Sequence, residues 1–155
     1  MPTENPSGAV YGVIVIGALL AAESGRHESY LDTLLSAAIA AALYWVAHSY
    51  AGVLGRRLST GERLTLGSLL AALAHDWALI RGASIPLLAL VVAALSGAAQ
   101  EAAVTAAVWS SVISLATFEL IAGLRSGAGR GELALEAGVG VAMGLAILAL
   151  KIVLH

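Results

Sequence analysis

Residues 31–54 read LDTLLSAAIAAALYWVAHSYAGVL, and this stretch decides the fold class. Beyond Asp32 near its start, small hydroxyl groups and His48 interrupt an otherwise apolar run. A helix needs about 20 predominantly apolar residues to cross roughly 30 Å of hydrocarbon. The stretch therefore predicts a membrane-spanning helix, and we use it as the reference for the rest of the chain.

The composition of the whole chain agrees with this stretch. Hydrophobic residues make up 59% of the sequence and charged residues 12%, with a mean hydropathy of +0.90. Soluble domains carry about 25% charged residues, so this chain lacks the polar groups that a soluble surface needs. The apolar runs show no polar alternation of the kind that a β-barrel strand requires. Because backbone groups in hydrocarbon must be satisfied internally, helices are the expected solution.

Several classes of function are excluded by what the sequence lacks. The chain has no cysteine, so it has no disulfide, zinc-thiolate site or thiol nucleophile. Its net charge is −2 and it has no run of Lys or Arg, which argues against a nucleic-acid partner. HExxH, GxSxG and P-loop patterns are absent. We therefore expect no enzyme activity, no cofactor and no metal.

The remaining apolar runs predict one all-α domain, a polytopic transmembrane bundle of four to five short helices. The spans are expected at about 8–22, 31–54, 85–99, 102–124 and 133–154. Ser59 and Glu62 match a capping box and predict that a further helix, 60–81, begins there. We expect Gly82-Ala83-Ser84 to end that helix and Pro86 to lie in the first turn of the next.

The basic residues bear on whether 60–81 crosses the membrane. Cytoplasmic loops are enriched in Lys and Arg. If 60–81 lies flat or tilted at the interface, six of the eight basic residues fall on one side: Arg56, Arg57, Arg63, Arg81, Arg125 and Arg130. If it crosses, this bias disappears. We therefore favour five crossings with a cytoplasmic N-terminus and an amphipathic or tilted helix 60–81. A single kinked helix over 60–99 is the rival arrangement.

Ionisable residues within apolar segments are the candidates for function, because charge in a bilayer is costly. His48 comes first, and helical spacing places Tyr44 on its face. His75, Asp76 and Glu119 complete the set of candidate transport residues. The alternative for each is structural, as a hydrogen-bonded side chain or a solvated helix end.

Two other patterns have weaker implications. Glu23, His27 and Glu28 are close in sequence, but their loop position favours solvation over metal binding. Two glycine pairs match the GxxxG spacing that lets helices approach closely, Gly8 with Gly12 and Gly140 with Gly144. We favour packing within one chain for these pairs over an interface between copies.

The stretch Tyr44-Trp45-Val46-Ala47-His48-Ser49-Tyr50-Ala51 resembles small uncharacterised integral membrane proteins of actinobacteria. Val10-Tyr11-Gly12, His75-Asp76-Trp77 and the end of the chain from Leu150 to His155 add to this resemblance. The resemblance implies a multi-pass protein of a bacterial plasma membrane. It implies no activity.

These observations lead to three hypotheses of function, of which an intramembrane enzyme ranks last because no catalytic constellation is visible. The first is a homo-oligomeric protein for permeation or transport of ions, protons or small solutes, in contact with membrane lipid. The second is a non-catalytic membrane interaction or sensor subunit, in which the polar residues only hold helices together. A common cavity facing His48 and Asp76 would favour the first.

Overall fold

The structure is a computed structural model that describes residues 6–22, 29–61, 63–126 and 129–154. Within these ranges the chain forms six helices and no strand, which confirms the all-α prediction. The helices are α1 (Pro6–Ala22), α2 (Tyr30–Thr60), α3 (Leu66–His75), α4 (Trp77–Leu95), α5 (Gln100–Ser126) and α6 (Arg130–Leu154).

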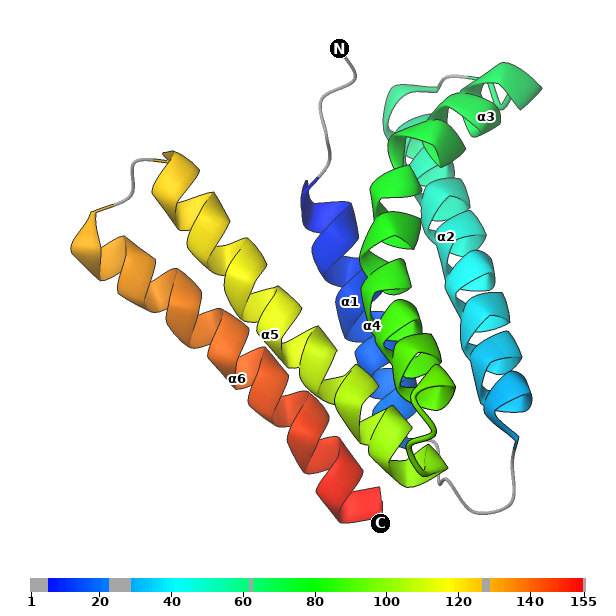
Figure 1. Ribbon diagram of the computed structural model, residues 1–155. Helices are drawn as coiled ribbons and strands as arrows, with labels where there is room; N and C mark the ends of the chain where they lie inside the picture. Colours follow the sequence, from blue (N-terminus) through cyan, green and yellow to red (C-terminus); the bar gives the residue numbers. More distant parts are fainter. Residues whose placement is uncertain (1–5, 23–28, 62, 127–128, 155) are drawn as a thin grey trace.

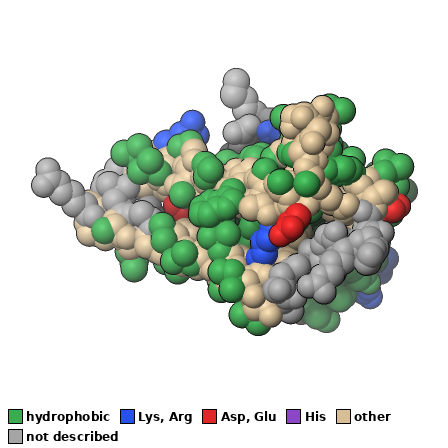
Figure 2. All heavy atoms as spheres, turned by 60° about the horizontal axis from the view of Figure 1, so that its bottom comes forward, with side chains coloured by type: hydrophobic (Ala, Val, Ile, Leu, Met, Phe, Trp, Pro, Cys, Tyr) green, Lys and Arg blue, Asp and Glu red, His purple; other side chains and the backbone are tan. Residues whose placement is uncertain are grey.

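Five of these helices run up and down along the bundle, and α3 lies across one end of it (Figure 1). The start of α1, the end of α2, the end of α5 and the start of α6 all lie at that same end. We call it the basic end, because the arginines used above for orientation lie there: Arg56, Arg57, Arg63, Arg81, Arg125 and Arg130. The opposite end, where α1 and α6 finish, is called the far end. Figure 2 turns the far end toward the viewer and shows hydrophobic side chains with few charged groups among them.

Three helices are long and apolar enough to cross a membrane, judged by length and composition. They are α2, α4 and α5, with the apolar part of α5 taken to Arg125. Helix α1 has 17 residues, and the apolar part of α6, Gly138–Val153, is also shorter. The prediction of four to five crossings therefore stays a prediction.

The predicted helix start at Ser59 is wrong. Helix α2 continues to Thr60, and the Ser59 hydroxyl donates to the carbonyls of Gly55 (3.1 Å) and Arg56 (3.0 Å) in its own last turns. Gly61 then ends α2 in the left-handed region, with φ of 72°, a conformation that suits glycine. The next helix begins later, after Thr65, whose side chain caps it together with Ser68.

The predicted break at Gly82–Ser84 and helix start at Ile85 are also wrong. The chain turns at Asp76, and α4 runs from Trp77 through both Gly82 and Pro86. At Gly82 the absence of a side chain lets α1 pack directly on the backbone of α4. A Cβ at Gly82 would lie 2.0 Å from the Ala9 carbonyl oxygen. A proline ring crowds the carbonyl four residues earlier, which here belongs to Gly82. Close packing of α1 on α4 therefore outweighs both helix-breaking residues.

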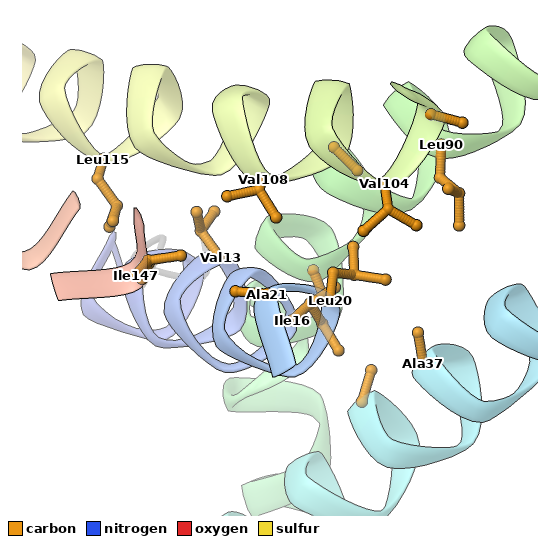
Figure 3. Packing of buried hydrophobic residues seen from close by; sticks show 14 residues of the cluster. Val13, Ile16, Leu20, Ala21, Ala37, Leu90, Val104, Val108, Leu115 and Ile147 are labelled. Carbon is orange, nitrogen blue, oxygen red and sulfur yellow. The ribbon is translucent and has the colours of Figure 1, made fainter. Parts of the chain in front are cut away.

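The core is built around α1 (Figure 3). Val13, Ile16 and Leu20 of α1 are fully buried. They lie against buried residues of the neighbouring helices, including Leu90, Val104, Val108, Leu115, Ile147 and Ala37. The shortest of the five long helices is thus the most enclosed, and its two ends have different surroundings.

Candidate functional site

Helix α5 packs against the core around α1 from its first turns to about Leu115. Ala103, Ala107 and Ser111 recur every fourth residue and are fully buried. Their small size lets the helices approach, and a Cβ added at Gly17 of α1 would lie 2.8 Å from the Ser111 side chain. Toward the basic end α5 carries larger residues such as Phe118, and it diverges from α1 and α4 (Figure 1).

The divergence leaves a groove of about 1010 Å³ between α1, α4, α5 and α6. Three of these helices each line it with one stripe of residues at i, i+3, i+4 and i+7, the spacing of a single helix face. The stripes are Ser7, Val10, Tyr11 and Ile14 of α1, Ala78, Arg81, Gly82 and Ile85 of α4, and Phe118, Ile121, Ala122 and Arg125 of α5. Ala9, Glu119 and Met143 complete the lining.

The groove is polar at one end and apolar at the other. Ser7, Arg81 and Arg125 lie in the terminal turns at or near the basic end. Phe118 lies two turns further in than Arg125, about 10 Å at 1.5 Å per residue. Ile14 and Ile85 are likewise one turn or more deeper than the polar members of their stripes. The groove therefore presents cationic groups at its mouth, and its inner lining is apolar except for Glu119 and the Tyr11 hydroxyl.

Glu119 is the one candidate transport residue that lines this groove. Its side chain is half-buried and passes over Gly140 of α6. A Cβ at Gly140 would lie 2.8 Å from the Glu119 Cγ. Gly144, one turn later, gives the same room to Val112. This glycine pair thus lets α6 approach α5 beneath a charged residue.

The first glycine pair lies between α1 and α4. A Cβ at Gly12 would be 2.0 Å from the Leu79 carbonyl oxygen, and one at Gly8 would be 3.3 Å from the Leu79 nitrogen. Both glycines therefore lie at contacts within the chain, and they hold one wall of the groove together.

His48 lies between two tyrosine rings. Its ring centroid is 5.9 Å from that of Tyr44 in a stacked arrangement and 5.9 Å from that of Tyr11 in a tilted one. Tyr44 belongs to the same helix face, as the spacing predicts. Tyr11 also lines the groove, so His48 reaches the groove wall only through Tyr11.

Asp76 lies outside the groove lining and accepts a hydrogen bond from α2. The Ser49 hydroxyl, fully buried, donates to the Asp76 carboxylate at 2.9 Å. Trp45 donates to the Leu73 carbonyl at 3.0 Å and meets Trp77 edge-on, with ring centroids 5.2 Å apart. These contacts attach the turn between α3 and α4 to α2.

The candidate residues therefore do not form one site. Neither His48 nor Asp76 lines the groove, and they have different partners. His75 lies at the exposed end of α3. Glu23, His27 and Glu28 lie outside the described residues.

Sequence reasoning treated Arg81 and Arg125 only as markers of orientation and did not select Tyr11. Helical spacing in the sequence could have indicated these three residues, because each shares a helix face with apolar residues that line the groove. The sequence does not show that the three stripes face one another. In comparisons with known proteins, no family model, curated protein or solved structure matches the chain.

Proposed function

We propose that the protein is a multi-pass protein of a bacterial plasma membrane, with a cytoplasmic N-terminus, that transports a small solute through the groove. One observation carries this proposal: Arg81, Glu119 and Arg125 all line one groove of about 1010 Å³ whose other described lining residues are mostly apolar. Ionisable groups inside spanning segments are expensive and mark solute pathways in membrane proteins. The volume matches the upper range of small-molecule sites, roughly 300–1000 Å³.

The groove has one open and one closed end. Toward the far end the groove stops at the buried side chains of Val13, Leu115 and Ile147, which fill the space between the helices. A solute that enters at the basic end meets this barrier. Transport then requires α5 and α6 to move relative to α1 and α4, so that the barrier opens when the mouth closes.

In this proposal the two arginines hold the solute, Glu119 lines its path, and His48 has no direct contact with it because it lies outside the groove lining. The site lies within one chain, so a pathway between copies is not needed. Association of copies stays a prediction, which native mass spectrometry in detergent measures.

A flux assay in proteoliposomes tests the proposal. Two tracers are followed separately: an entrapped radiolabelled dicarboxylate and a fluorescent phospholipid placed in the inner leaflet. We expect wild-type protein to move at least one tracer faster than empty liposomes do. Arg125→Gln should slow that movement at least about tenfold, because it removes one charged hydrogen-bonding group from the groove lining.

His48→Gln is the matched control, because His48 lies outside the groove lining. It should change the rate less than about twofold, within the effect of a surface substitution. If His48→Gln and Arg125→Gln slow the tracer equally, the groove is not the pathway. If neither tracer moves faster than in empty liposomes, transport is wrong and the interaction or sensor subunit becomes the better hypothesis.

A further inference from the structure

We propose that the solute of this groove is an anionic phospholipid of the surrounding bilayer, bound with its phosphate between Arg81 and Arg125. One acyl chain then lies along the apolar inner wall formed by Ile14, Ile85, Phe118 and Met143. This inference rests on the proposed function, because it names the substrate class of the same site.

The charges at the mouth of the groove select an anion. Two arginines line the groove against one carboxylate, Glu119. Arginine presents a planar set of donors that matches phosphate oxygens in pairs. The two arginines come from different helices, α4 and α5, and both line the groove.

The walls of the groove select a lipid over a water-soluble anion. All the lining residues beyond the mouth are apolar apart from Glu119 and the Tyr11 hydroxyl. The groove is not enclosed, and Ile121 on its rim is 41% exposed. In a bilayer, an open apolar groove between spanning helices is filled by hydrocarbon, whereas a small hydrophilic anion gains nothing from such walls.

The dimensions of the groove agree with one leaflet. The hydrocarbon of a bilayer is about 30 Å thick, so one leaflet is about 15 Å. Phe118 lies about 10 Å inward from Arg125, which is within that depth. A phosphate held at the arginines thus places its chain along the groove for the depth of one leaflet.

The position of the headgroup also agrees with the charge of the membrane. Arg56, Arg57 and Arg63 lie at the same end as Arg81 and Arg125. In the favoured orientation this end faces the cytoplasmic leaflet, where anionic lipids attract basic residues. The groove is therefore open to the leaflet that supplies its ligand.

Lipid binding is measured by native mass spectrometry of the full chain in detergent, titrated with phosphatidylglycerol or phosphatidylcholine of identical acyl chains. We expect one phosphatidylglycerol to bind more tightly than phosphatidylcholine. Arg81→Gln and Arg125→Gln should each weaken phosphatidylglycerol binding about fivefold and together roughly thirtyfold, from the usual effect of one basic residue on an anionic lipid.

The matched control is the double variant Arg56→Gln and Arg57→Gln. It removes the same charge from the same end of the molecule but outside the groove. This control should change phosphatidylglycerol binding less than about twofold. If both double variants weaken binding equally, the lipid is held by general surface charge and the groove assignment is wrong.

A steric variant tests the apolar part of the site without changing charge. Ala122→Trp puts a large side chain into the groove, whereas Ala116→Trp puts the same side chain on the exposed surface of α5 outside it. Only Ala122→Trp should abolish the one-lipid complex, while far-ultraviolet circular dichroism shows both variants folded. Equal binding by the two variants would overturn the proposal.

The binding assay separates this inference from the proposed function. If the dicarboxylate moves and phosphatidylglycerol does not bind, transport stands and the lipid assignment is wrong. If phosphatidylglycerol binds through Arg81 and Arg125 but neither tracer moves, the lipid site stands and transport is wrong.

Discussion

The two halves of α5 make different contacts with α1, although both belong to the same pair of straight helices. In the far half, Ser111 is fully buried and meets Gly17 directly. In the half near the basic end, Ala122 and Ile121 are exposed and line a groove. The difference shows that side-chain size along one helix face decides whether two helices seal a core or leave a binding site.

The two halves also differ in the chemistry of their polar groups. The Ser111 hydroxyl in the far half donates to the Ala107 carbonyl of its own helix at 3.1 Å. A hydroxyl satisfied in this way can be buried at little cost. The other half carries Glu119 and Arg125, which are too large and too strongly charged for such burial. These residues therefore favour an open groove in this half.

The largest expected effect comes from breaking the contact between α1 and α4, the two helices that both halves of α5 face. In Gly82→Ala the new Cβ would fall 2.0 Å from the Ala9 carbonyl oxygen, so α1 must move away from α4. We expect a loss of about 3 kcal/mol in the free energy of unfolding, the upper range for overpacking. The measurement is unfolding in detergent followed by circular dichroism.

Gly55→Ala is the control for that prediction, because a Cβ there meets nothing within 4 Å. It should be neutral or stabilising by up to about 1 kcal/mol, since alanine favours a helix more than glycine does. If the two glycine variants are equally stable, α1 and α4 are not in close contact.

The same enlargement made in the two halves should have opposite outcomes. Ser111→Leu inserts a bulky side chain where the helices touch and should cost about 2 kcal/mol of unfolding free energy. Ala122→Leu adds the same volume beside the groove and should change stability by less than about 0.5 kcal/mol. Equal losses in the same denaturation experiment would mean that both halves are packed, and the comparison would not hold.

The smallest effect concerns access from water. The chain has no cysteine, so a single introduced thiol reports its own surroundings. In detergent without added lipid, we expect a water-soluble maleimide to label Ala122→Cys at least about tenfold faster than Ser111→Cys, because a buried thiol reacts only after local opening. Leu120→Cys, at the same depth but outside the groove lining, is the reference for depth alone. If Leu120→Cys reacts as fast as Ala122→Cys, the groove gives no special access.

Much of the fold could be predicted from local sequence. The helix cores at 8–22, 31–54, 102–124 and 133–154 fall within α1, α2, α5 and α6, because long apolar runs have few alternatives to a helix. The errors are concentrated between residues 59 and 86. There, the helix is capped by Thr65 and not by Ser59, and close packing of α1 on α4 overrides the two helix-breaking residues, Gly82 and Pro86.

The site could be predicted only in part. Glu119 was selected because a carboxylate within an apolar segment is costly, and that reasoning needs no structure. The same reasoning selected His48 and Asp76, which the structure places against Tyr44, Tyr11 and Ser49. The free-energy cost of placing a charged side chain in an apolar segment is reduced by a hydrogen-bonding partner or by a position in a solvated groove. The sequence does not distinguish these two cases.

By itself the sequence determined that the described chain is helical and that its basic residues gather on one side, because hydrophobicity and charge act locally. Only the tertiary structure decided where the groove lies. Three stripes with helical spacing become one site when Gly12 and Gly82 hold α1 against α4 and the larger residues of α5 hold it apart. Which helix faces meet depends on contacts between segments far apart in the chain, and no local pattern specifies those contacts.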